Sequence, residues 1–127
     1  MKDFSVKLTN KPGDLARVAQ ALARRGVNIK ALAGLSMDGM ALARILPDDT
    51  VAARSALEAA NIRFTESEVH LVLLENKAGI LADVANRLGE AGINLDAIYV
   101  TGIAEDLVEL AIASDDPKKA KRILDEF

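Results

Sequence analysis

The chain has 127 residues, half of them hydrophobic, with a formal net charge of −3, one histidine and no cysteine. The acidic balance argues against a nucleic-acid partner, which needs a basic surface, and the lack of cysteine excludes disulfides, thiolate metal sites and a cysteine nucleophile. No apolar run approaches membrane-spanning length and the first residues lack a signal peptide's apolar segment, so we expect a soluble, cytoplasmic protein without a membrane partner.

The first half of the chain predicts six elements in the order strand, helix, strand, strand, helix, strand. Alternating apolar and polar residues indicate the strands, apolar residues at helical spacing indicate the helices, and Asp38-Gly39 indicates a hairpin turn. In chain order we expect these elements at residues 4–8, 15–25, 28–35, 41–46, 50–60 and 61–65.

The second half predicts the same order but lacks the last strand. Its elements are expected at residues 69–74, 80–91, 95–103 and 107–113, followed by a helix that starts at Pro117 with Asp116 as its N-cap. A missing fourth strand leaves residues 69–74 with an open edge, and open edges are normally covered. Either another chain or one long strand through residues 61–75 completes this sheet, or the short edge is tolerated.

The two halves are copies of one unit. Asn10 to Leu15 returns as Asn76 to Leu81, 66 residues later, and the register holds without a gap as far as Asn28 and Asn94. It then slips by one residue, which we place at the hairpin, where an insertion costs little. Internal repetition at this period predicts two similar domains, at residues 1–66 and 67–127.

Side chains suited to catalysis are scarce. His70 has no basic or acidic cluster around it in the sequence, and a lone histidine at a strand start is a surface or packing residue far more often than a general base. The paired carboxylates Asp48-Asp49 and Asp115-Asp116 stand at helix starts, where capping explains them. We therefore expect no enzyme activity, no metal and no cofactor.

The turn between the first strand and the first helix of each unit is the most informative segment. Gly13 and Gly79 stand where a strand passes into a helix, and a glycine there lets a ligand approach the backbone. The free N–H groups and dipole of the helix favour a carboxylate, while Asn10 and Asn76 offer both a donor and an acceptor. Such a turn suits an amino-acid zwitterion. The alternative is plain turn chemistry, which uses the same residue types.

These residues resemble the ACT domain, a small-molecule-sensing module of amino-acid biosynthetic enzymes and their regulators. The resemblance rests on the repeated strand, Asn-x-Pro-Gly-x-Leu loop, amphipathic helix and Gly-(Val/Ile)-Asn-(Ile/Leu) segment, and it covers the whole chain. It implies an α+β fold of two ferredoxin-like (βαββαβ) units, packed with their antiparallel sheets edge to edge.

The resemblance also implies where an amino acid would bind. The strand–helix loop of one unit would face the second strand of the other. The implied ligand-binding residues are Asn10, Pro12, Gly13, Asp14, Leu15, Asn28, Ile29, Asn76, Ala78, Gly79, Ile80, Leu81, Asn94 and Leu95. Two departures weaken the match: Pro12 becomes Ala78 in the second loop, and Leu8 and Leu74 stand where some members carry a polar residue.

Two functions follow from these observations. The first is a non-catalytic sensor that binds a free amino acid at the interface of its units, forms a homo-oligomer, most simply a dimer, and regulates an enzyme of amino-acid metabolism. The second is a structural interaction module that binds a protein through an exposed sheet edge, without a small-molecule ligand.

Overall fold

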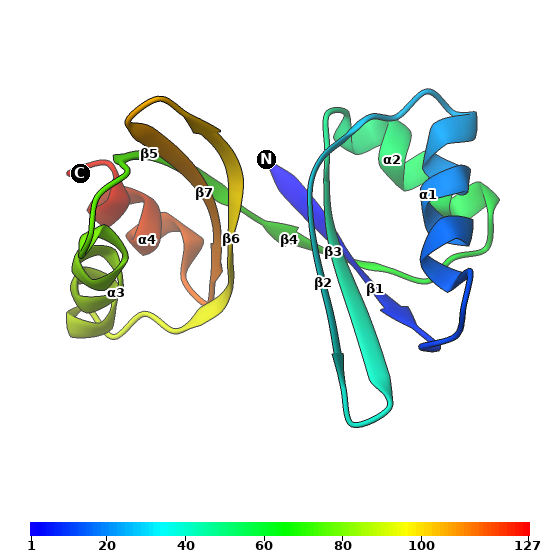
Figure 1. Ribbon diagram of the computed structural model, residues 1–127, viewed down its shortest axis with the longest axis horizontal. Coiled ribbons are helices and arrows are strands. Elements are labelled where there is room, and N and C mark those ends of the chain that lie inside the picture. Colours follow the sequence, from blue (N-terminus) through cyan, green and yellow to red (C-terminus); the bar gives the residue numbers. More distant parts are fainter. The chain divides into compact units, whose positions relative to one another are not determined.

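The computed structural model describes residues 1–127 and divides them into two compact units, Met1–Ser67 and Glu68–Phe127. In each unit two helices cover one face of an antiparallel sheet (Figure 1). This is the α+β, ferredoxin-like arrangement that the sequence predicts. None of the helices combines the length and the apolar character needed to cross a membrane.

The first unit contains six elements, in the predicted order. They are β1 (Lys2–Leu8), α1 (Asp14–Arg24), β2 (Ile29–Met37), β3 (Met40–Pro47), α2 (Thr50–Ala59) and β4 (Thr65–Glu68). The strands lie in the order β2-β3-β1-β4, with β3 antiparallel to both β1 and β2. The predicted hairpin turn is confirmed, since Met37 pairs with Met40 around Asp38 and Gly39, which both have positive φ angles.

The second unit repeats this plan with one strand fewer. It contains β5 (His70–Glu75), α3 (Ile80–Glu90), β6 (Leu95–Ala104), β7 (Leu107–Ser114) and α4 (Pro117–Leu124). The sheet order is β5-β7-β6, so β5 is an edge strand where β1 of the first unit is internal. The absence of a fourth strand in this sheet agrees with the prediction.

Each unit has its own hydrophobic core between sheet and helices. In the first unit Phe4 and Ile45 from the sheet pack with Leu22 and Leu57 from the helices, and all are at most 1% exposed. In the second unit Leu88 and Leu124 occupy the corresponding helix positions. Burial of each such side chain contributes about 1.5–3 kcal/mol to the stability of the fold. The apolar face of each helix therefore packs against the sheet.

The paired carboxylates have two different roles, which corrects our interpretation of all four as caps. Asp49 caps α2 by accepting a hydrogen bond from Ala52 N at 3.0 Å, and Asp116 caps α4 through Lys119 N at 3.1 Å. Asp48 instead accepts from Asn28 N at 3.1 Å. Its counterpart Asp115 does the same for Asn94. The first carboxylate of each pair therefore ties the start of a strand to a distant turn.

The predicted fourth strand at residues 61–65 is wrong in its position, because β4 begins only at Thr65. Asn61 takes a left-handed conformation, with φ of 57°, and Ile62 N donates to Leu57 O at 3.0 Å. These bonds close the C-terminal end of α2. The chain then needs residues 62–64 to cross from the helix layer to the sheet before pairing can begin.

The one-residue slip between the copies lies inside β6, not at the hairpin turn where we placed it. The pairing of β6 with β7 jumps between Val100 and Gly102, so Thr101 is an extra, bulged residue that β2 lacks. Thr101 Oγ1 donates to Glu109 Oε1 at 2.6 Å. A bulge absorbs one residue without reversing the faces of the strand on either side.

The long strand proposed through residues 61–75 does not complete the second sheet. Only Val69 separates β4 from β5, but β4 belongs to the four-stranded sheet and β5 to the three-stranded one. Within the chain, the outer edge of β5 therefore has no strand beside it in its own sheet.

Candidate functional site

The first strand–helix loop contains two left-handed residues. Asn10 has a φ of 55° and Gly13 has a φ of 87°. Gly13 is the N-cap residue of α1, and no side chain caps this helix. A Cβ at Gly13 would meet nothing within 4 Å, so the left-handed backbone conformation, and not lack of space, favours glycine here.

Asp14 holds this loop closed. Its Oδ2 accepts hydrogen bonds from Thr9 N at 2.7 Å and Thr9 Oγ1 at 3.0 Å, while Oδ1 lies 3.1 Å from Arg17 Nη2. The Thr9 backbone N–H, with further help from its hydroxyl and from Arg17, lowers the pKa of Asp14 below its ordinary value. Both carboxylate oxygens are thus engaged within the protein, and the side chain is only 12% exposed.

The second loop also has a left-handed glycine, but it lacks a carboxylate in the place of Asp14. Gly79 is the N-cap residue of α3, with a φ of 89° and no side-chain cap. Ile80 stands where the first loop has Asp14, and Ala78 where it has Pro12. Instead, Asn76 N donates to Asp106 O at 2.7 Å, which ties the end of β5 to the β6–β7 turn.

The four helices therefore fall into two classes at their N-termini. Aspartates cap α2 and α4, whereas left-handed glycines begin α1 and α3 without any side-chain acceptor. The first N–H groups of a helix have no partner inside the helix. In α1 and α3 the first of these donors bonds within the loop, since Asp14 N donates to Lys11 O at 3.2 Å and Ile80 N to Lys77 O at 3.3 Å. The next N–H groups, and the positive end of the helix dipole, stay available to an anion from outside.

A small pocket adjoins each of these loops. The first has a volume of about 290 Å³ and the second about 280 Å³. Leu8 and Leu15 line the first pocket, and Leu74 and Ile80 line the second. Leu8 and Leu74 are equivalent positions of the repeat. The other walls, which include Leu32 on β2 and Leu107 on β7, could not be predicted from the loop motifs, because they come from strands that are distant in the sequence.

The structure does not bring all of the predicted binding residues together within one unit. Asn28 and Ile29 follow α1, whereas the loop precedes it, and the 11 residues of α1 span about 16 Å (Figure 1). Asn94 and Leu95 stand in the same relation to the second loop. A single site containing both a loop and an asparagine of this kind would need to draw them from two units.

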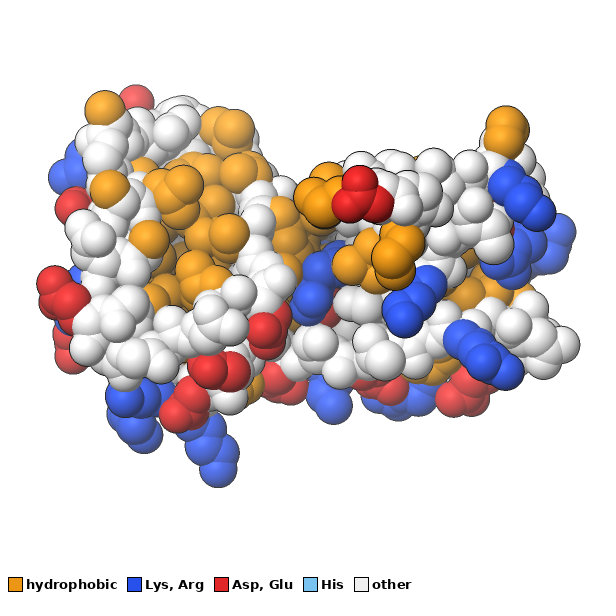
Figure 2. All heavy atoms as spheres, turned by 90° about the horizontal axis from the view of Figure 1, so that it is seen from below, with side chains coloured by type: hydrophobic (Ala, Val, Ile, Leu, Met, Phe, Trp, Pro, Cys, Tyr) orange, Lys and Arg blue, Asp and Glu red, His pale blue; other side chains and the backbone are white.

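Other surfaces carry little chemistry. Nε2 of His70 lies 3.4 Å from Asp125 Oδ1, and Lys121 Nζ donates to Asp125 Oδ2 at 2.8 Å, so these groups form an ion-pair cluster. No cluster of three or more His, Cys, Asp or Glu is placed to hold a metal ion. Figure 2 shows apolar side chains gathered over the second unit, where Leu73 and Ile103 are 58% and 67% exposed. Exposed apolar surface of this kind is typical of a ligand-binding or protein-contact face.

Comparison with protein families finds a match in the second unit. The family model described as the ACT domain matches residues 71–127, which make up nearly all of the second unit. None of the curated proteins compared with the chain matches its sequence.

Solved structures match the whole chain. A protein of Bacteroides thetaiotaomicron aligns at 25% identity with a TM-score of 0.87, covering 98% of this chain and 86% of that one. The regulatory subunit of aspartate kinase from Thermus thermophilus aligns at 19% identity and 0.71, covering 98% and 90%. The aspartate kinase of Clostridium acetobutylicum, described as an allosteric enzyme, aligns at 16% and 0.62, covering 97% and 32%. These alignments extend the shared fold to both units.

Proposed function

We propose that the chain is a tandem ACT-domain protein and a non-catalytic sensor of a free amino acid, since residues 71–127 match the family and residues 1–67 repeat the fold and the loop. The observation that carries this proposal is the pair of uncapped helix N-termini at Gly13 and Gly79, each beside a small apolar pocket.

Each part of an amino acid has a matching group at the loop. The carboxylate would accept hydrogen bonds from the first N–H groups of α1 or α3, which no side chain caps. The ammonium group needs acceptors, which the exposed Asn10 or Asn76 amide oxygen and loop carbonyls can supply. The side chain would enter a pocket lined largely by leucine, isoleucine and alanine, which favours an apolar amino acid.

The two loops are not equal. Pro12 and the bonds from Asp14 to Thr9 and Arg17 hold the first loop in one conformation. The second loop has Ala78 and Ile80 at these positions and so lacks both constraints. A preorganised loop loses less conformational freedom on binding, so we propose that the first loop binds the amino acid more tightly than the second.

Regulation would require the ligand to favour one state of a larger assembly. A ligand shifts an equilibrium only by the difference between its affinities for the two states. We propose that the sensor acts as a homo-oligomer on an enzyme of amino-acid metabolism. Two observations support this: the family of residues 71–127, and the fold shared with a regulatory subunit of aspartate kinase.

Thermal unfolding with each of the twenty amino acids in turn tests the proposal. A ligand at about 100 times its dissociation constant adds roughly 2.7 kcal/mol, which is several degrees for domains of this size. We expect a clear rise in melting temperature with one or a few apolar amino acids. No rise with any of them would contradict the sensor proposal.

A matched pair of variants locates the site. Gly13→Val places a side chain where the ligand would approach, and Gly26→Val imposes a similar left-handed strain at the far end of α1, since φ is 87° and 69°. Both should lower stability by about 1–2 kcal/mol, but only Gly13→Val should reduce the response to the amino acid. An equal response in the two variants would remove the loop from the site.

The interaction module is the second candidate, because β5 is an edge strand of a three-stranded sheet. An edge strand can bind an extended segment of another protein through main-chain hydrogen bonds. This function predicts no amino-acid response and an association that weakens when Leu73, 58% exposed on β5, is changed to lysine.

A further inference from the structure

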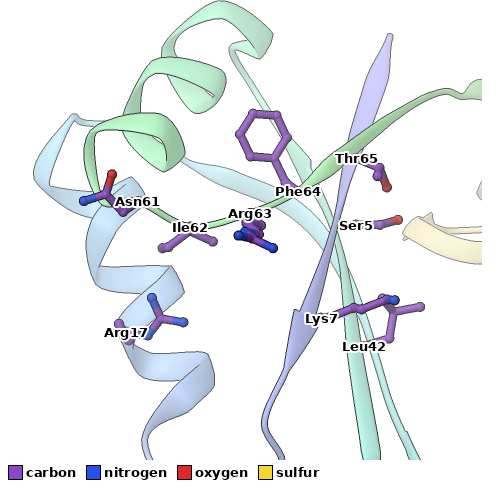
Figure 3. A pocket seen from close by; sticks show the side chains of 9 residues that line it. All are labelled: Ser5, Lys7, Arg17, Leu42, Asn61, Ile62, Arg63, Phe64 and Thr65. Atoms are coloured by element: carbon purple, nitrogen blue, oxygen red, sulfur yellow. The ribbon is translucent and has the colours of Figure 1, made fainter.

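A further pocket of the first unit lies apart from the strand–helix loop. Its volume is about 690 Å³, and it opens between α1, β1 and the segment that leads from α2 to β4 (Figure 3). This volume falls within the usual range for small-molecule sites. Neither the sequence pattern nor the proposed amino-acid site accounts for it.

Its central cation, Arg63, is held in place by its two neighbours. Ile62 is 5% exposed in the core, and the Phe64 ring packs edge-to-face against Phe4 with centroids 5.3 Å apart. Side chains alternate along an extended segment, so anchoring residues 62 and 64 inward turns Arg63 outward. Figure 3 shows Arg63 projecting from this segment between them.

The neighbouring wall comes from β1, by the same alternation. Val6 is buried in the core, which directs Ser5 and Lys7 to the opposite face, and Lys7 lies beside Leu42 in the register of β1 and β3. Figure 3 shows the hydroxyl-bearing side chains of Ser5 and Thr65 next to each other on this wall. All of these polar groups can donate hydrogen bonds.

The lining of this pocket is positively charged. Lys7, Arg17 and Arg63 line it, and no acidic residue does. Two other arginines of the unit are neutralised: Arg44 binds Asp3 at 2.8 Å and Arg54 binds Glu66 at 2.7 Å. Arg17 is paired with Asp14, but Lys7 and Arg63 have no carboxylate partner. Two positive charges are therefore uncompensated in one concave site.

We propose that this pocket binds a small organic phosphate. A phosphate monoester is close to a dianion at neutral pH and accepts the planar guanidinium of Arg63, the Lys7 ammonium and the hydroxyl donors together. Leu42 and Ile62 offer apolar contact to the organic part. An amino acid fits less well, because its ammonium group would lie among cationic side chains with no carboxylate in the lining to pair with it.

The proposal is independent of the amino-acid site, although the two are neighbours. Arg17 lines the phosphate pocket and also holds Asp14, which fixes Thr9 in the loop. A phosphate could instead bind the uncapped N-terminus of α1, so the experiment needs to distinguish these positions.

The test is a titration of the full chain with phenyl phosphate and with inorganic phosphate at constant ionic strength, followed by amide NMR shifts. We expect saturable shifts centred on Lys7, Arg63 and Thr65. Dimethyl phosphate, a monoanion, should bind at least tenfold more weakly than phenyl phosphate. Shifts confined to residues 13–16, or shifts that do not saturate, would overturn the proposal.

A charge-matched control separates a built site from general attraction. Arg63→Gln and Lys7→Gln remove lining cations, whereas Arg25→Gln removes an exposed cation of the same unit outside the pocket. We expect about tenfold weaker phenyl phosphate binding in each of the first two variants, and less than a twofold change in the third. Equal weakening in all three would show that net charge alone attracts the anion.

Discussion

At the scale of single residues, glycines recur in the two copies at positions with the same backbone conformation. Gly13 and Gly79 have φ angles of 87° and 89°, and Gly26 and Gly92 have φ angles of 69° and 75°. The same residue type recurs because each position needs a left-handed backbone, which costs other residues free energy. The loop asparagines do not follow this rule, since only Asn10 is left-handed. Asn76 has no positive φ angle, and its backbone N–H donates to Asp106 O at 2.7 Å.

The carboxylate of Asp14 makes a prediction about acid stability. Its pKa lies below the ordinary value because of the Thr9 N–H and hydroxyl, and then Arg17. A group with a lowered folded-state pKa stabilises the fold above its unfolded pKa of about 3.9, and this contribution is lost as the pH falls through the folded pKa. In Asp14→Asn, the free energy of unfolding should therefore fall less steeply below about pH 5 than in the parent.

Urea unfolding between pH 7 and pH 2.5 measures this slope. In Asp14→Asn the pH dependence of the unfolding free energy should be weaker but still present. Two other carboxylates keep lowered pKa values, because Arg54 donates a hydrogen bond to Glu66 and Lys121 donates one to Asp125. Asp96→Asn, which removes an exposed carboxylate, is the control. If the free energy of unfolding depended on pH equally in Asp14→Asn and the parent, the Asp14 carboxylate would not contribute to acid stability.

At the scale of elements, the helix starts are of two structural kinds. The aspartate caps of α2 and α4 satisfy N–H groups, whereas α1 and α3 begin at glycines. A helix whose N-terminus is needed for a ligand should lack its own acceptor, because a side-chain cap would compete for the same donors. The contrast within one chain supports assigning the first helix of each unit, and not the second, to binding.

The cap of α2 has a measurable energy. Asp49→Ala should lower the free energy of unfolding by about 1 kcal/mol, because Ala52 N loses its acceptor. Asp49→Asn should recover most of this loss, since asparagine is an equally good cap. Chemical denaturation of the two variants provides the comparison. Equal losses would indicate that the charge of Asp49, and not its hydrogen bond, is what matters.

At the scale of the whole molecule, the chain consists of two cores with no residue in common. Leu22 and Leu88 occupy matching helix positions and are at most 1% exposed. Truncating a buried leucine to alanine costs about 2–5 kcal/mol, so Leu22→Ala and Leu88→Ala should each lower the protection of core amides in their own unit by that amount.

Hydrogen exchange of the double variant completes this prediction. Because the two leucines share no packing partner, each unit of the double variant should lose what it loses in the single variant, within about 0.5 kcal/mol. A coupling above about 1 kcal/mol would contradict the assignment of separate cores.

Much of the fold could be predicted because its determinants are local. The apolar spacing of α1, the Asp38-Gly39 turn and the Asp116-Pro117 helix start each depend on a few adjacent residues. The repeat then made it possible to predict the elements of the second unit from those of the first. The loops at Gly13 and Gly79 were found in the same way, because left-handed turns and helix starts have their own residue preferences.

The errors concern contacts between residues far apart in the chain. The bulge at Thr101 exists only relative to β7, and the bond of Asp48 to Asn28 spans 20 residues. The start of β4 depends on the distance between the helix layer and the sheet, which residues 62–64 cross. No periodicity of contiguous residues encodes such distances.

The sequence by itself therefore determined the element types, their order, the duplication and the glycine loops, since local backbone preferences and apolar spacing act within a few residues. Only the tertiary structure decided which side chains share a space. Lys7, Arg17 and Arg63 are separated by up to 56 positions and form one pocket because Val6, Ile62 and Phe64 are drawn into the same core. Burial of apolar neighbours, not any motif among the cations, brings them together.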